Sequence, residues 1–184
     1  GESVAGVDNV TDIALTSTTG ARYVQAPTIT VAGPTARVLT TANVSLANDT
    51  FTITGHNMRT GTKLTYDSQG GTNLGQNSGS ISDSTELFVI RVDADTIKLA
   101  SSLSNAQAGT ALDMTGGSGN TGNNSQTLTG TTATATATIS GGAVSAITVT
   151  AVGSDYQSTP SVTVEAPKMT IPTGNVNALS LIHI

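Results

Sequence analysis

The chain has 184 residues, of which 36% are hydrophobic and 10% charged, and it contains no cysteine, which excludes disulfides, thiolate zinc sites and cysteine nucleophiles. Seven Lys and Arg against twelve Asp and Glu give a formal net charge of −5, whereas a nucleic-acid-binding protein needs a basic surface. We therefore do not expect nucleic acid as a partner. No apolar run approaches the roughly 20 residues that span a bilayer, so we do not expect membrane insertion either.

The composition favours β structure throughout. Val, Ile, Leu and Ala supply most of the hydrophobic residues, and Thr, Ser, Gly and Asn dominate the remainder. Val and Thr favour pleated, half-buried surfaces, and Gly, Asn and Ser favour the turns between them. We therefore predict an all-β fold of small antiparallel β-sandwich or hairpin modules in tandem repeat, with no helix longer than about two turns.

One sequence pattern occurs twice, at residues 10–34 and at residues 144–167. Apolar positions alternate in both segments, as in a strand with one buried face. With a one-residue gap, the matched pairs are Val10 and Val144, Ile13 and Ile147, Gly20 and Gly153, Tyr23 and Tyr156, Pro27 and Pro160, and Val31 and Val164. Asn43 also matches Asn175, so we predict a tandem repeat with a spacing of about 132 residues.

This pattern divides the chain into five parts. Residues 1–37 hold a truncated first copy, residues 38–129 an intervening β-hairpin domain, and residues 130–172 the second copy. Residues 173–178 would begin a further repeat. The last six residues are the translation of CTG TCT CTT ATA CAC ATC, an adapter end used in shotgun sequencing libraries. We expect residues 179–184 to be such an artefact on a metagenomic fragment, with an apolar terminal strand as the alternative.

The sequence pattern of the intervening domain predicts two hairpins. The first would turn between Gly55 and Gly61, because apolar and polar residues alternate on both sides of that stretch, at Phe51, Ile53, Leu64 and Tyr66. The second would turn at Asp93-Ala94-Asp95. We expect this second hairpin to gather apolar side chains on one face, with Phe88, Ile90 and Val92 beside Ile97 or Leu99.

Four further elements, one helical turn and three strands, follow along the chain. Residues 104–108 suit one helical turn, ahead of a strand at residues 110–114. From Thr131 onward Thr and Ala alternate, which predicts another strand. The pair Gly141-Gly142 then predicts a tight turn into the strand AVSAITVTAV.

The run ATATATISGGAVSAITVTAVGSDYQSTPSVTV resembles a β-repeat of phage and bacterial surface proteins. That repeat has an alternating Thr/Ala strand, a Gly-Gly turn, a second strand, a Gly-Ser-Gly-Tyr turn, and a Pro before a final Val/Thr strand. Gly153, Tyr156 and Pro160 match it here. Asp155 replaces the family's second Gly, and Arg22 replaces it in the first copy, so we expect these two turns to be less tight.

The intervening domain resembles a module of virion structural proteins from phages that infect marine cyanobacteria. The matching residues are Thr54-Gly55-His56, Gly61, Tyr66, Val92-Asp93, Asp95-Thr96-Ile97-Lys98-Leu99-Ala100, and Gly109. Together the two resemblances cover most of the chain and imply a tailed-bacteriophage virion structural or tail-fibre repeat protein. Both patterns also occur in large bacterial adhesins, and neither implies catalytic residues.

The sequence pattern predicts no catalytic, cofactor-binding or metal-binding residues. His56 follows Gly55 at a turn, where a side chain commonly bonds to the backbone and shapes the loop. Residues 117–122 match a dinucleotide-binding glycine pattern but lack the flanking strand and helix that it requires. We interpret Asp93 and Asp95 as turn formers, with calcium binding as the alternative.

Two tyrosines occupy equivalent places in the two copies. Tyr23 precedes Pro27 by four residues, and Tyr156 precedes Pro160 by the same spacing. We expect each tyrosine to pack over its proline and the strand that follows. Stacking on a sugar is the alternative use of these rings.

These patterns indicate a non-enzymatic structural component of a phage virion, in a tail fibre, neck or decoration protein, which acts through assembly and spacing. Its expected partners are other virion structural proteins, including further copies of itself in a homo-oligomer, and its expected location is the virion. The alternative is a carbohydrate-binding or adhesin module of a bacterial surface protein, with a cell-surface glycan as partner. A polysaccharide-degrading tailspike fits less well, because two Phe, three Tyr and no Trp supply few sugar platforms.

Overall fold

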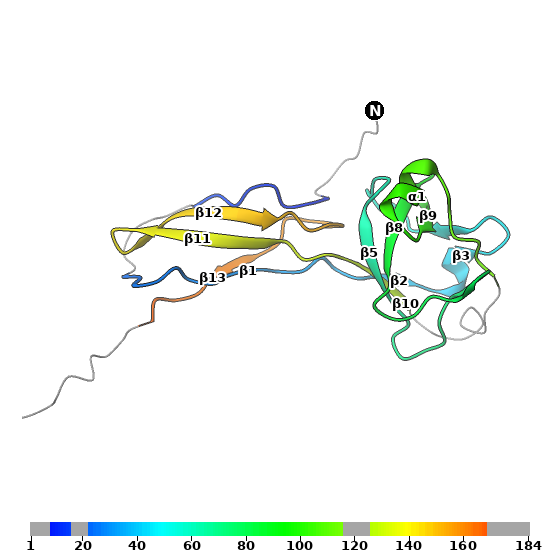
Figure 1. Ribbon diagram of the computed structural model, residues 1–184, viewed down its shortest axis with the longest axis horizontal. Helices are drawn as coiled ribbons and strands as arrows, with labels where there is room; N and C mark the ends of the chain where they lie inside the picture. The colour runs from blue at the N-terminus through cyan, green and yellow to red at the C-terminus, as the bar shows by residue number, and fades with distance from the viewer. Residues whose placement is uncertain (1–7, 16–21, 116–125, 169–184) are drawn as a thin grey trace, which may run out of the picture.

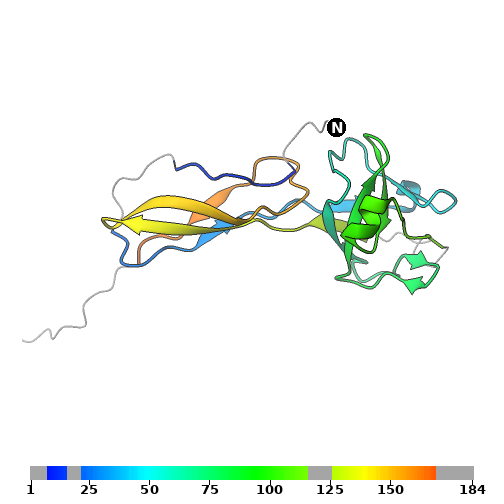
Figure 2. The ribbon, with the colours of Figure 1, turned by 45° about the horizontal axis from the view of Figure 1, so that its top comes forward.

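The computed structural model describes residues 8–15, 22–115 and 126–168. The molecule is elongated, with a slender part at one end and a compact part at the other (Figure 1). We call the described residues of 8–36 and 131–168 the rod module, and those of 37–130 the head module. Figure 2 shows the same division from a second direction, with the strands of the rod module running along the long axis.

A seven-stranded antiparallel sheet is the framework of the head module. In spatial order its strands are β2 (Arg37–Leu39), β10 (Gln126–Gly130), β5 (Lys63–Asp67), β8 (Glu86–Arg91), β9 (Thr96–Ala100), β4 (Thr50–Thr52) and β3 (Val44–Ser45). Three smaller elements complete the module: the strand pair β6 (Gly75–Gln76) and β7 (Gly79–Ser80), the 3-10 turn η1 (Thr41–Asn43), and the helix α1 (Leu103–Ala108). The chain enters through β2 and leaves through β10. The head module is therefore inserted, along the chain, between the two halves of the rod module. Since β2 and β10 pair with each other, the two connections to the rod module lie side by side.

The strand pairing confirms the predicted all-β fold. Every strand pair among the described residues is antiparallel. The helix α1 has six residues, within the predicted limit of about two turns. It begins after Ser102, whose hydroxyl accepts a hydrogen bond from the Asn105 N–H, and it ends at Gly109 in the left-handed conformation.

The head module has a dense apolar core. Alternate residues of β5 and β9 are buried, as the two-residue period of a strand requires. The cluster consists of Leu39, Phe51, Met58, Leu64, Tyr66, Leu74, Ile81, Leu87, Val89, Ile97, Leu99, Met114 and Leu128. The Tyr66 hydroxyl accepts a hydrogen bond from the Leu74 N–H at 3.0 Å, and burial raises the pKa of this phenol.

The first predicted hairpin does not form. β4 and β5 were expected to pair around the stretch from Gly55 to Gly61, but β8 and β9 lie between them in the sheet. β4 pairs instead with β3 and β9. The connecting stretch carries His56 and Met58 into the interior, with 1% and 0% of their surfaces exposed. A connection that fills the core in this way cannot close as a tight turn.

The second predicted hairpin forms, with a different buried face. β8 and β9 pair around the Asp93-Ala94-Asp95 turn in a register that places Val89 opposite Leu99. Leu87 and Val89 therefore share the core face with Ile97 and Leu99, and the expectation that Phe88, Ile90 and Val92 would do so is wrong. The register of the turn decides which of the two apolar faces of β8 is buried.

The predicted strand at residues 110–114 is also wrong. The Leu112 N–H donates to the Leu99 carbonyl at 2.7 Å, whereas the Met114 N–H donates to the carboxylate of Asp49 at 2.8 Å. These two backbone groups thus bond to different elements, and the contact with β6 is a single bridge between Met114 and Gln76, so no strand forms here.

The rod module consists of two strand pairs around a narrow core. β11 (Thr134–Ser140) and β12 (Ala143–Ala151) form the predicted hairpin around Gly141-Gly142, and β1 (Ile29–Val31) pairs with β13 (Val162–Val164). The buried residues of the core are Val10, Ile29, Val31, Ala133 and Tyr156. The Thr residues of β11 stand at alternate positions and their side chains are exposed, in agreement with the Thr/Ala alternation of the sequence.

Residues 10–15 do not form a strand, although their alternation matches that of β12. Val10 is buried and Ile13 and Leu15 are half-buried, but no strand pair contains them. β12 receives its partner β11 through the Gly141-Gly142 turn. In the first half, the positions that correspond to residues 135–140 of β11 are residues 1–6, which lie outside the described residues.

Candidate functional site

Polar side chains converge where the rod module meets the head module. Arg37, at the start of β2, donates to Asp155 of the rod module through Nε at 2.8 Å and through Nη2 at 2.6 Å. Nη2 also donates to the carbonyl of His56 at 2.6 Å. The two side chains are only 9% and 1% exposed, so this two-pronged ion pair is a buried link between the modules.

Asp155 has a backbone conformation that is uncommon for a residue other than glycine. Its φ is 56°, in the left-handed region that glycine adopts most readily. Burial raises the pKa of its carboxyl group, while the hydrogen bonds and the charge of Arg37 act in the opposite direction. The side chain of Asp155 makes an ion pair with Arg37 that a glycine at this position could not make.

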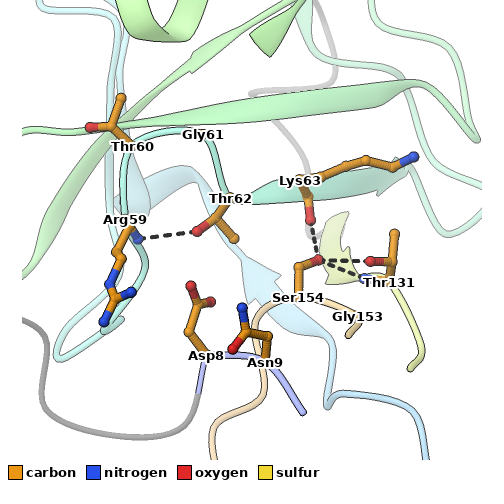
Figure 3. A pocket seen from close by; sticks show the side chains of 10 residues that line it. All are labelled: Asp8, Asn9, Arg59, Thr60, Gly61, Thr62, Lys63, Thr131, Gly153 and Ser154. Carbon is orange, nitrogen blue, oxygen red and sulfur yellow. Dashed lines mark hydrogen bonds between the residues drawn. The ribbon is translucent and has the colours of Figure 1, made fainter. Parts of the chain in front are cut away.

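Ser154 ties three chain segments together beside this ion pair. Its hydroxyl donates to the Lys63 carbonyl at 2.6 Å and accepts from the Thr131 N–H at 2.9 Å (Figure 3). Two glycines allow the segments to approach so closely. A Cβ on Gly130 would lie 2.0 Å from the Ser154 carbonyl oxygen, and one on Gly153 would lie 2.5 Å from that of Thr131.

A polar hollow of about 340 Å³ opens at this junction. Asp8 and Asn9 of the rod module point toward the head-module loop that carries Arg59 and Thr62 (Figure 3). Lys63 and Ser154 complete one wall. The hollow combines the carboxylate of Asp8, the guanidinium of Arg59 and the amide of Asn9, whereas the Lys63 ammonium is paired with Glu86. These groups can hydrogen-bond a small polar ligand such as a sugar.

The four predicted turn residues of the head module come together at one end of the sheet. The Asp95 carboxylate accepts from the Gly55 N–H at 2.7 Å, and the Asp93 carboxylate accepts from the Asp95 N–H at 2.8 Å. The bond from the Asp95 N–H is the main reason that the pKa of the Asp93 carboxyl lies below its usual range. Among the described residues no group of three or more His, Asp or Glu is arranged to hold a metal ion.

His56 joins these two turns as a neutral side chain. The Met58 N–H donates to Nδ1 at 2.9 Å, so Nδ1 is an acceptor and the proton lies on Nε2, which faces the Asp93 carbonyl at 3.0 Å. Burial lowers the pKa of this imidazole. The predicted loop-shaping role of His56 therefore has a direct structural basis.

The hydroxyl groups of the two tyrosines make the same kind of bond, each to a backbone carbonyl of the other half of the rod module. The Tyr23 hydroxyl donates to the Glu165 carbonyl at 2.9 Å, and the Tyr156 hydroxyl donates to the Ala32 carbonyl at 3.1 Å. Tyr156 is 3% exposed and also accepts from the Ala133 N–H at 2.8 Å. Its ring is therefore not available for stacking on a sugar.

The remaining predicted positions are placed as follows. Pro27 is buried and Pro160 is half-buried, and Gly20 lies outside the described residues. Sequence reasoning missed Arg37 and Ser154, because a lone Arg or Ser in a polar stretch carries no signal of its partner. The one available signal was Asp155, which departs from the glycine of the repeat pattern.

These features define an all-β protein in which a seven-stranded head is inserted into a slender, strand-paired rod. Comparison with protein-family models, curated proteins and solved structures found no match to the chain. In the described residues, no helix has the length and apolar character needed to cross a membrane.

Proposed function

We propose that this chain is a non-enzymatic structural segment of a phage virion, in a tail fibre, neck or decoration protein, and that it acts through assembly and spacing. The two sequence resemblances support this role. The structural observation that carries it is the buried junction, because a spacer transmits position only when its modules keep a fixed orientation.

Two independent features restrict hinge motion at the junction. The chain crosses it twice, from β1 to β2 and from β10 to β11, and β2 and β10 are hydrogen-bonded neighbours. The buried Arg37–Asp155 ion pair then links the two modules directly. Two adjacent connections with a buried cross-link resist both bending and twisting.

The fixed orientation is tested by small-angle X-ray scattering of the whole chain. We expect a single elongated shape whose maximum dimension does not change between low and high salt. Variable dimensions would contradict the spacer role. The virion assignment is tested separately by recovering the parent reading frame, which should lie among phage structural and packaging genes and not among metabolic genes only.

The junction hollow favours a second candidate, a carbohydrate-binding module. Since Tyr156 is buried, the binding groups would be the exposed Arg59 and the half-buried Asp8 and Asn9. A saturable glycan-array signal that Arg59→Ala and Asp8→Ala abolish would support this function. Thr138→Ala, on the exposed face of β11, is the matched control and should leave the signal unchanged.

A further inference from the structure

The pairing of β1 with β13 is centred on equivalent residues. Thr30 lies opposite Thr163, and these two residues occupy the same position in the aligned segments. On either side, Ile29 faces Val164 and Val31 faces Val162. Exchanging the two segments therefore reproduces the same register, which is the property of an axis of two-fold symmetry.

The hydrogen bonds around this axis also occur in pairs that the two-fold symmetry relates. The Ala32 N–H donates to the Ser161 carbonyl at 2.9 Å, and the Glu165 N–H, at the equivalent position, donates to the Thr28 carbonyl at 2.9 Å. The two tyrosine hydroxyl bonds, to Glu165 and to Ala32, are related in the same way.

A third pair of bonds lies farther from the axis. The Tyr23 N–H donates to the Gly142 carbonyl at 2.8 Å, and the Tyr156 N–H donates to the Asp8 carbonyl at 3.0 Å. Asp8 and Gly142 stand at equivalent positions when Val10 is aligned with Val144. Three independent pairs of contacts thus obey one symmetry, although composition alone would require none of them.

We propose that residues 22–34 and 155–167 are two copies of one self-complementary pairing unit, and that the partner of this unit is another copy of itself, in the same chain or in a second copy of the chain. The apolar side chains at the interface are Ile29 and Val31 in one copy and Val162 and Val164 in the other. All four are β-branched and apolar, so a copy can replace its counterpart with little change in chemistry. This inference does not depend on the virion assignment.

Pairing within one chain is favoured by the high effective concentration of two tethered segments. A chain whose first copy cannot pair exposes the edge of β13 and its half-buried valines, and an exposed strand edge is a template for pairing with another chain. The same unit would then join separate chains, with Thr163 facing Thr163 of the second chain.

The test uses the whole chain, which has no native cysteine. Facing residues of an antiparallel pair have Cα atoms about 4.5 to 5.5 Å apart, within the range that a disulfide bridges. Thr30→Cys combined with Thr163→Cys should oxidise to a monomeric, internally linked chain. Adding Ile29→Asp and Val31→Asp to Thr163→Cys alone should block the first copy, double the mass in light scattering, and give a chain-to-chain disulfide.

Thr148→Cys in the same blocked background is the matched control, because Thr148 is exposed on β12 away from the axis. It should give no chain-to-chain disulfide. A second measurement leaves the first copy intact: Thr163→Cys alone, refolded at high protein concentration, should yield a linked dimer, and Thr148→Cys should not. Monomers in both measurements, or equal linkage at residues 163 and 148, would overturn the proposal.

Discussion

The head and rod modules are stabilised in different ways although both are built from antiparallel strands. In the head module, Phe51, Leu64 and Tyr66 are fully buried in one continuous cluster. In the rod module, the core is small, Ile29 still exposes 9% of its surface, and most of the apolar residues packed there are half-buried. A module with so little buried apolar area depends on strand pairing and on buried hydrogen bonds for its single conformation.

The largest expected effect contrasts the two cores directly. Phe51→Ala should lower the free energy of unfolding by about 3 to 5 kcal/mol, because it leaves a cavity in a fully buried site. Ile147→Ala, at a half-buried position of β12, should cost only about 1 kcal/mol. Urea denaturation followed by circular dichroism measures both. Equal losses would contradict the contrast between a dense and a thin core.

The next effect concerns the link between the modules. Asp155→Asn keeps a side chain that tolerates the left-handed backbone but leaves Arg37 buried without its counter-charge, which should cost about 3 kcal/mol. The exposed Asp12→Asn is the matched control and should be neutral within about 0.5 kcal/mol. Adding Arg37→Met to Asp155→Asn should recover part of the loss, and failure to recover any would assign the cost to the turn itself.

A smaller difference should separate the two tyrosines. Tyr156→Phe leaves the buried Ala133 N–H and the Ala32 carbonyl without this partner, so it should cost about 1 to 3 kcal/mol. Tyr23→Phe removes one bond at a half-buried site and should cost about 0.5 to 1 kcal/mol. Thermal unfolding of the two variants provides the comparison, and a larger loss for Tyr23 would contradict it.

The smallest effect is a dependence of head-module stability on pH. The folded state lowers the pKa of His56 below the ordinary value of 6.5, so the unfolded chain takes up a proton more readily than the folded one. The contribution of neutral His56 to the free energy of unfolding is therefore fully present above about pH 6.5, and it decreases as the pH falls below that value. His56→Gln should be less stable at neutral pH but should lose this slope between pH 7.5 and 5.5, as measured by urea midpoints. If the slope does not change in this variant, the pH dependence of stability arises from other titratable groups.

Local patterns were enough to predict several elements correctly. The Gly141-Gly142 hairpin, the hairpin at Asp93-Ala94-Asp95 and the short helix α1 form where the sequence indicated, because each is closed by contacts between residues close in the chain. Two predictions that failed, a hairpin between β4 and β5 and a strand at residues 110–114, required knowledge of which distant segment supplies the partner.

The sequence by itself determined the all-β class, the turns at Asp93-Ala94-Asp95 and Gly141-Gly142, and the correspondence between residues 10–34 and 144–167. Only the tertiary structure decided that the halves of this correspondence pair with each other about Thr30 and Thr163, and that Arg37 meets Asp155 across 118 residues of chain. Alternation and turn chemistry act over a few residues and are visible in the sequence. Strand partners and buried ion pairs depend on the packing of the whole chain, because any exposed edge or buried charge accepts whichever complementary group the fold brings to it.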